Sequence, residues 1–201
     1  MSEHYYSKKP SAGSRPEKIT EAILGAEFRF TVDRGVFSRA GLDFGSRLLI
    51  ETFESPEADG MFADAGCGWG PIGIALAKIH TDRKIVMVDV NERAVELAKL
   101  NAEANKVSDR VEVFQNDLLT GLTDKGFAAI LTNPPIRAGK EVVFQLYEQA
   151  FLSLVQEGEL WVVIQKKQGA PSTQKKLEEL GLKVEVSKKS RGYFILRGKK
   201  C

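Results

Sequence analysis

The 201-residue sequence predicts a doubly wound α/β fold, in which a mostly parallel sheet of seven strands has helices on both faces. From Met61 onward, short apolar segments alternate with amphipathic segments that are long enough to be helices. This alternation is typical of parallel strands joined by crossover helices. The last two apolar segments have no helix between them, so we expect the chain to end in an antiparallel hairpin.

The individual elements follow from this pattern. Parallel strands are expected near residues 61–65, 84–89, 110–114, 127–132 and 159–165. Helices are expected near residues 71–79, 91–104, 141–156 and 172–180. The hairpin is expected to pair Leu182–Ser187 with Tyr193–Arg197 around a turn at 190–192. Before the first parallel strand, Leu42–Phe53 has a helical pattern, and the alternation in Glu27–Val32 is typical of a strand.

Length and composition predict one ordinary globular domain, at residues 21–201, behind a flexible arm at residues 1–20. No apolar run approaches the length of a membrane span, and the polar start lacks a signal-peptide core, so we expect a cytoplasmic location. Two cysteines make no disulfide framework, and two histidines in unrelated contexts predict no metal site. The net charge of +2 does not itself predict nucleic-acid binding, although much positive charge lies in the last 40 residues.

A glycine-rich turn joins the first parallel strand to its helix. The segment Gly66–Gly70 reads GCGWG, and its glycines allow positive φ angles and close approach of a ligand. Residues 68–73 match the dinucleotide pattern G-x-G-x-x-G, but Asp64 just before the turn is a poor neighbour for a pyrophosphate. An acid suits a cationic ligand such as S-adenosylmethionine, which has an amino group, a sulfonium and no phosphate. We expect this ligand to contact Gly66, Cys67, Gly68 and Gly70, with Cys67 as a small filler residue.

Acidic residues lie at or near the ends of three successive strands, at Asp64, Asp89 and Asp117. The carboxyl ends of parallel strands meet at one edge of a sheet, where α/β folds bind their ligands. Asp89 can accept hydrogen bonds from both ribose hydroxyls, and Asp117 can accept one from the adenine amino group. With their neighbours Val90 and Asn116, these acids complete the predicted cofactor site.

The fourth strand ends in the rigid turn Asn133-Pro134-Pro135. Two prolines stop the strand and fix their own φ angles, and Pro134 also restricts Asn133. Because proline has no N–H, hydrogen-bond acceptors dominate this turn. The Asn133 amide oxygen and the Pro134 carbonyl can each accept one N–H of an NH2 group, which predicts a catalytic site formed by Asn133, Pro134 and Pro135.

The motifs together resemble the class I S-adenosylmethionine-dependent methyltransferases over roughly residues 35–200, and the fold implied is their Rossmann-like one. Asn133–Pro135 is similar to the signature of enzymes that methylate planar amines, namely adenine N6, guanine N2 and glutamine amides. Gly35–Ser38 and Gly41–Leu49 resemble the ribosomal RNA guanine-N2 methyltransferase C family and other proteins of the methyltransferase small domain group. The resemblance implies that the substrate is a guanine in the RNA of the small ribosomal subunit.

This chain departs from the resemblance at two points. Longer members of the family carry an additional N-terminal domain, so we expect this protein to act without one, as a monomer or a homodimer. The aromatic residue usual after the two prolines is replaced by Ile136, and Phe37 is a candidate substitute for stacking on a base, with core packing as its alternative role. Ile136 is still expected to contact the substrate. The candidates for holding the adjoining phosphates are Arg137, Lys140, Lys166 and Lys167, with ordinary surface charge as their alternative role.

Three other functions remain open from the sequence. A glutamine-amide methyltransferase acting on a translation factor would also use Asn-Pro-Pro, because an amide NH2 resembles a base NH2. A methyltransferase-like RNA-binding protein that has lost catalysis would bind the cofactor without methylating any RNA. The presence of Asp64, Asp89, Asp117 and Asn133 argues against such a loss of catalysis. An NAD enzyme would fit the glycine pattern but would give Asn133 no role.

Overall fold

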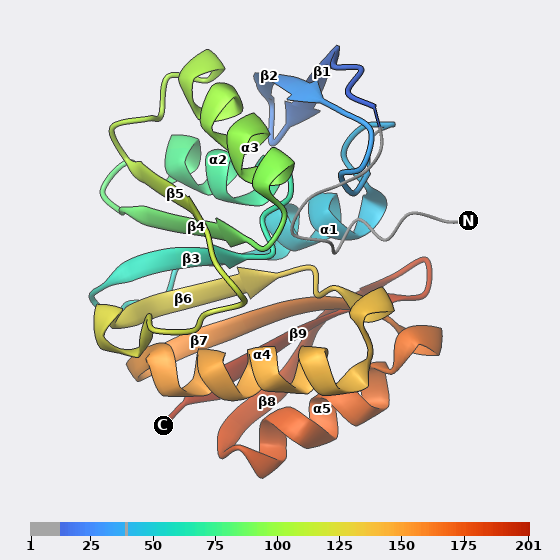
Figure 1. The fold of residues 1–201 in the computed structure, drawn as a ribbon. Helices are drawn as coiled ribbons and strands as arrows, with labels where there is room; N and C mark the ends of the chain where they lie inside the picture. Colours follow the sequence, from blue (N-terminus) through green and yellow to red (C-terminus); the bar gives the residue numbers. More distant parts are fainter. Residues whose placement is uncertain (1–12, 39) are drawn as a thin grey trace.

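The computed structural model describes residues 13–38 and 40–201, and its centre is a seven-stranded sheet (Figure 1). The strands are β3 (Met61–Ala65), β4 (Ile85–Asp89), β5 (Val111–Gln115), β6 (Phe127–Thr132), β7 (Leu154–Gln165), β8 (Leu182–Ser190) and β9 (Tyr193–Lys200), in the order β5-β4-β3-β6-β7-β9-β8. Strands β3 to β7 are parallel, whereas β9 is antiparallel to both of its neighbours. The predicted α/β fold with a C-terminal antiparallel hairpin is confirmed.

Helices cover both faces of this sheet (Figure 1). The helices on one face are α1 (Phe44–Thr52), α2 (Pro71–Ile79) and α3 (Glu92–Ala104), and those on the other are α4 (Lys140–Ser153) and α5 (Ala170–Glu179). Because side chains of a strand alternate between the two faces, Phe62 joins the first core and Ala63 joins the second. The short 3-10 helices η1 (Thr123–Lys125), η2 (Ile136–Ala138) and η3 (Lys166–Gln168) lie in the connections.

The boundary between α4 and β7 differs from the prediction. Residues 154–156 were expected in the helix, but α4 ends at Ser153 and Leu154 pairs with Phe127 of β6. The register of this pairing then shifts before Glu159, near Glu157 at a φ of 63° and the buried Gly158. Pairing with the sheet therefore outweighs the helical propensity of this stretch.

The N-terminal region contains a hairpin that the sequence predicted only in part. Strands β1 (Glu17–Ile23) and β2 (Ala26–Val32) form a separate antiparallel sheet beside α3 (Figure 1). Residues 17–20 therefore belong to a strand, which corrects the expected arm at residues 1–20. The part of that arm at residues 1–12 lies outside the described residues.

Asn101 of α3 and Asn105, the C-cap of that helix, serve as hydrogen-bonding partners for β2. Asn101 Oδ1 accepts from Thr31 N at 2.6 Å, and its Nδ2 donates to Thr31 O at 2.9 Å and to Trp69 O at 2.8 Å. One helical turn later, Asn105 makes the same pair of bonds to the backbone of Arg29. The two amides thus satisfy backbone groups on the open edge of β2 and join the hairpin to the glycine loop.

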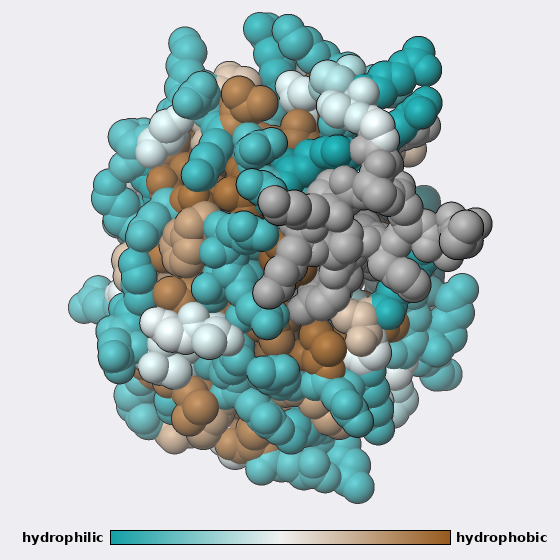
Figure 2. Space-filling model, in the orientation of Figure 1, coloured by the Kyte–Doolittle hydropathy of each residue, from teal (hydrophilic) through white to brown (hydrophobic). Residues whose placement is uncertain are grey.

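The surface is mostly hydrophilic on the face that Figure 2 shows, with hydrophobic residues in smaller groups. The large exposed apolar side chains of the described residues, apart from Phe37, lie singly on different elements: Leu24, Ile79, Leu100 and Leu152. None of the helices in the described ranges combines the length and hydropathy that a membrane crossing requires.

We expect Asn101→Ala to lower the free energy of unfolding by about 2–4 kcal/mol, because Thr31 N–H, Thr31 C=O and Trp69 C=O would lose buried partners. The exposed Lys99→Ala on the same helix is the control and should change it by less than about 0.5 kcal/mol. Urea denaturation followed by circular dichroism measures both. Equal effects of the two substitutions would contradict the role given to Asn101.

Candidate active site

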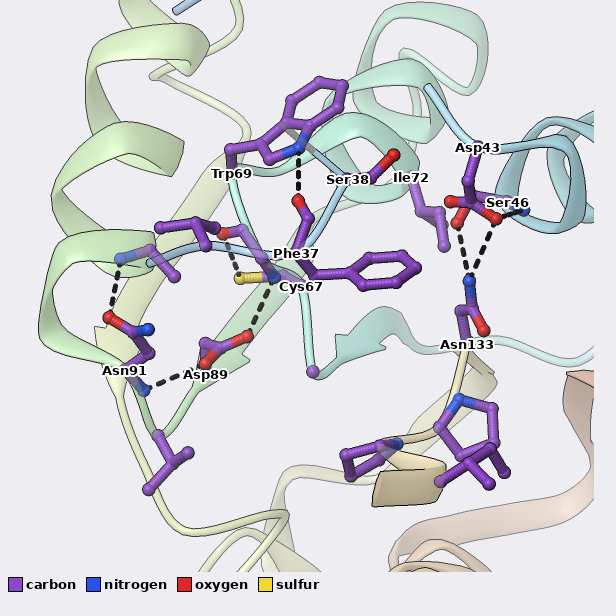
Figure 3. A pocket seen from close by; sticks show the side chains of 18 of the residues that line it. Phe37, Ser38, Asp43, Ser46, Cys67, Trp69, Ile72, Asp89, Asn91 and Asn133 are labelled. Atoms are coloured by element: carbon purple, nitrogen blue, oxygen red, sulfur yellow. Dashed lines mark hydrogen bonds between the residues drawn. The ribbon is translucent and has the colours of Figure 1, made fainter. Parts of the chain in front are cut away.

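A cavity of about 420 Å³ opens where the carboxyl ends of the parallel strands meet (Figure 3). Of the residues predicted for the site, those that line it are Phe37, Gly66, Cys67, Gly68, Asp89, Val90, Asn116, Asn133, Pro134, Pro135, Ile136 and Arg137. The predicted residues that do not line it are Asp64, Gly70, Asp117, Lys140, Lys166 and Lys167. The structure therefore brings most of the predicted site residues to this cavity, although other residues supply more than half of its wall.

The glycines of the loop after β3 lack a side chain for two different structural reasons. Gly66 and Gly68 have φ angles of 77° and 55°, and a Cβ on either would meet no atom within 4 Å. Both line the cavity, so their lack of side chains keeps space for a ligand against the backbone. At Gly70 a Cβ would come within 2.9 Å of Ile74 and Met87, so this glycine serves helix packing instead.

Cys67 lies in the same loop and is 4% exposed. Burial raises the pKa of its thiol well above the ordinary value, and the nearby carboxylates of Asp64 and Asp89 act in the same direction. The thiol therefore stays protonated, which agrees with its expected role as a small apolar filler.

Asp89 is held at the end of β4 by backbone donors. Its Oδ2 accepts from Gly68 N at 2.8 Å and its Oδ1 from Asn91 N at 2.9 Å. Burial raises the pKa of this carboxyl, while these hydrogen bonds act in the opposite direction. Each carboxylate oxygen retains a further lone pair, so the group can still accept a pair of ligand hydroxyls from the cavity.

Asp64 does not face the cavity, contrary to the sequence-based expectation. It is fully buried, and its Oδ2 accepts from Gly73 N at the start of α2 at 2.8 Å. Its Oδ1 has no hydrogen-bond partner among the described residues. Desolvation raises the pKa of Asp64 to about 7, opposed by the Gly73 bond and supported by the charge of Asp89.

The third acidic residue is also displaced from its expected place. Asp117 is exposed and lies outside the cavity wall, whereas the preceding Asn116 lines it. Asn116 Nδ2 donates to the carbonyls of Leu118 and Thr120, each at 3.1 Å. These bonds fix the orientation of the amide at the end of β5.

Asn133 is held by the beginning of α1. Its Nδ2 donates to Ser46 Oγ at 3.0 Å and to Asp43 Oδ1 at 3.3 Å (Figure 3). A carboxylate only accepts hydrogen bonds, so the amide nitrogen must face Asp43 and the amide oxygen must point away from it. Asp43 also caps α1 by accepting from Ser46 N at 3.0 Å, so the helix cap and the Asn133 orientation share one carboxylate.

The two prolines form a tight turn after Asn133. Pro135 has φ −75° and ψ 74°, and Pro134 O accepts from Ile136 N at 2.8 Å, which is an inverse γ-turn. A carbonyl oxygen has two lone pairs, so one remains on Pro134 for a ligand. Ile136 occupies the following position in the cavity wall and packs partly against the second core.

The loop that carries Phe37 is anchored by hydrogen bonds to its backbone. Asn91 Nδ2 donates to Gly35 O at 2.9 Å, and Trp69 Nε1 donates to Phe37 O at 3.0 Å. Phe37 is 40% exposed, and its ring projects into the cavity between Asp89 and Asn133 (Figure 3). Of its two expected roles, the position favours contact with a ligand over core packing.

Sequence reasoning missed several residues of the wall. Asp43 and Ser46 lie 90 and 87 residues from Asn133, so no local pattern could connect them. Tyr193 lines the cavity and its hydroxyl bonds to Gln165 Nε2 at 2.5 Å. A usable signal existed here, because the first residue of an antiparallel strand reaches the edge where its parallel neighbour ends.

We expect the contribution of Asp64 to the free energy of unfolding to fall as the pH rises from 5 to 7, because folded Asp64 retains a proton that the unfolded chain has released. Asp64→Asn removes this titration and keeps an oxygen that can accept from Gly73. Between pH 5 and 7, the free energy of unfolding of the variant should therefore decrease less than that of the parent protein, by on the order of 2 kcal/mol. Urea denaturation at both pH values measures the difference. Parallel pH profiles for the two proteins would refute the assignment.

Comparisons with known proteins agree with this geometry. The chain is 53% identical over 201 residues to "Uncharacterized protein YbxB" of Bacillus subtilis (strain 168), with all of both chains covered. Its structure matches the T. Thermophilus 16S rRNA N2 G1207 methyltransferase RsmC, in complex with AdoMet and guanosine, with a TM-score of 0.80 and 25% identity. That match covers 96% of this chain but 52% of RsmC, so this chain spans about half of that protein.

A methyltransferase from Pyrococcus furiosus shares the fold, with a TM-score of 0.64 and 22% identity over 76% of this chain and 80% of that one. The model of the methyltransferase small domain matches residues 27–197. These findings confirm the expected methyltransferase class and its cofactor, S-adenosylmethionine. The chain belongs to the methyltransferase small domain family.

Proposed function

We propose that the protein transfers a methyl group from S-adenosylmethionine to the exocyclic N2 amine of a guanine in RNA of the small ribosomal subunit. The observation that carries the proposal is the pair of acceptors at the end of β6, because Asn133 Oδ1 is turned away from α1 and Pro134 O keeps one lone pair. Two adjacent acceptors suit an NH2 group, which has two hydrogens to donate. The likeness to an RNA guanine-N2 methyltransferase supports guanine as the bearer of that group.

The cavity has room for the cofactor beside the glycine loop. The open backbone at Gly66 and Gly68 fits a ligand that lies against it, and Asp89 can accept from a ribose. Val90 and Asn116 would border the adenine, since both line the cavity next to Asp89. Asp64, buried behind the loop, would act on the ligand only through Gly73 and the loop backbone.

Methyl transfer to guanine N2 must be assisted by the protein, because this amine is a weak nucleophile. S-adenosylmethionine supplies a methyl group on a sulfonium that leaves readily. The lone pair of guanine N2 is delocalised into the ring, so Asn133 Oδ1 and Pro134 O would hold its two N–H groups and aim the lone pair at the methyl carbon. As the N–C bond forms and the S–C bond breaks, these fixed dipoles would stabilise positive charge on the nitrogen, which then loses one proton to water.

Asn133 can act in this way only if its amide is already oriented. Ser46 and Asp43 accept hydrogen bonds from Nδ2, and these bonds select one of the two flipped orientations of the amide before substrate binds. We therefore assign Ser46 and Asp43 as positioning residues for Asn133. Phe37 would stack on the base, because its ring lies between the Asp89 and Asn133 sides of the cavity while Ile136 offers no aromatic surface (Figure 3).

The proposal is tested with 30S subunits and naked ribosomal RNA from a strain that lacks the gene for this protein. Transfer of a radiolabelled methyl group followed by nucleoside analysis should give label in N2-methylguanosine. Label in a different nucleoside would overturn the guanine assignment. Label in protein only, recovered as methylated glutamine, would replace the RNA substrate by a protein amide.

We expect Asn133→Ala to lower kcat by about 10²–10³-fold while the affinity for S-adenosylmethionine changes less than about twofold. Ser46→Ala should lower kcat by about tenfold, because the helix cap uses Ser46 N and survives while the amide loses one anchor. The exposed Ser55→Ala is the matched control and should behave as the parent protein. A Ser46→Ala enzyme with unchanged kcat would contradict the positioning role.

The positioning role also has a spectroscopic readout that does not need a substrate. The side-chain NH2 signals of Asn133, assigned by their loss in Asn133→Ala, should shift and exchange faster with water in Ser46→Ala. They should be unchanged in Ser55→Ala.

A further inference from the structure

We propose that two neighbouring turns at the mouth of the cavity form a docking surface for the phosphate backbone of RNA. The surface consists of Lys166 and Lys167 in η3, Lys188 and Lys189 near the end of β8, and Arg191 in the β8–β9 turn, and we call these five residues the cationic rim. The inference rests on the proposed function and deepens it, because it names how the RNA chain is held beside the reactive base.

The two turns are joined by the backbone. Lys166 N donates to Gly192 O at 2.9 Å, and Gln165 pairs with Tyr193 in the register of β7 and β9. Gln165 Nε2 also bonds to the Tyr193 hydroxyl at 2.5 Å. The η3 turn and the β8–β9 turn therefore form one continuous border.

The charge of this border is not neutralised within the described part of the chain. All five residues of the cationic rim are exposed, and none forms an ion pair with another described residue. No acidic residue occurs in segments 164–170 or 186–194 of the sequence. Other cations of the C-terminal region are paired instead, as Arg197 is with Glu159 and Lys199 is with Glu157.

Two cations of the rim rest on aromatic rings. The Arg191 guanidinium lies 4.9 Å from the Phe44 ring centre, and the Lys189 ammonium lies 4.9 Å from that of Phe194. Such contacts limit the freedom of the side chains without cancelling their charge, so less entropy is lost when they meet an anion.

The position of the rim favours a nucleic acid over an acidic protein. Gln165 and Gln168, which flank Lys166 and Lys167, line the cavity, and so does Tyr193, two residues after Arg191. A base that enters the cavity brings a phosphate on either side, and these anions would lie over the adjoining turns. A protein glutamine would bring no such regular charge, so the rim would then have no partner.

The test compares two triple variants of the full-length protein. The rim variant carries Lys166→Gln, Lys167→Gln and Arg191→Gln. The control carries Lys99→Gln, Lys106→Gln and Lys183→Gln, which removes three exposed cations that also lack ion pairs with described residues. Lys99 and Lys106 lie in or just after α3, and Lys183 lies at the opposite end of β8 from the rim. Both have the same net charge, so a difference between them reports position and not total charge.

The readout is the affinity for a single-stranded ribosomal RNA fragment, measured by fluorescence anisotropy from 50 to 300 mM salt. We expect the slope of log K against log salt to fall by about 2 in the rim variant, close to 0.7 for each phosphate that the protein no longer neutralises. In the control variant the slope should stay within about 0.5 of the parent value. Thermal unfolding and S-adenosylmethionine binding verify that both variants are folded.

Equal slopes for the two variants would overturn the docking surface, and so would RNA binding by the parent protein that does not depend on salt. These results are separable from the proposed function. If the parent protein methylates guanine but the rim variant binds RNA normally, the docking surface is wrong and the function stands. If the rim variant loses RNA binding but no RNA nucleoside is ever methylated by the parent, the surface stands and the function is wrong.

Discussion

The site depends on the hydrogen bonds that join the Asn133 amide to the beginning of α1. This contact connects the end of a central strand to a helix that also packs against β7 and β9. Because Asp43 both caps the helix and receives the amide, the entry of α1 and the orientation of the catalytic candidate cannot vary separately. A preorganised acceptor of this kind keeps its orientation without solvent reorganisation, which is the main advantage of such dipoles in catalysis.

The parts of the fold that were predicted from sequence are those governed by local patterns. The buried run before Asn133 and the glycine turn after β3 define their elements through apolar periodicity and backbone restriction. The errors occurred where tertiary pairing decided the outcome. Leu154 extends into the sheet because Phe127 offers a partner, and β1 forms because β2 lies beside it.

The sequence indicated which strand ends carry residues of the candidate site, but it was less successful for the direction in which individual side chains point. Asp64 alternates with Ala63 and Ala65, so it shares a face with Phe62 and points toward α2 instead of toward the strand end. The two-residue period of a strand already contained this information. By contrast, nothing in the sequence near Asn133 indicates Asp43 or Ser46, because a contact across about 90 residues depends on the completed fold.

The antiparallel strand β9 adds a second aromatic residue, besides Phe37, to the wall of a cavity in which Ile136 follows the two prolines. Since β9 runs opposite to β7, its first residue, Tyr193, lies beside Gln165 at the edge where the parallel strands end. The same reversal places the β8–β9 turn, with its cations, next to η3. A base in the cavity and the phosphates that flank it would therefore meet one continuous border, because Tyr193 pairs with Gln165 and the Lys166 N to Gly192 O bond joins the two turns that carry the cationic rim.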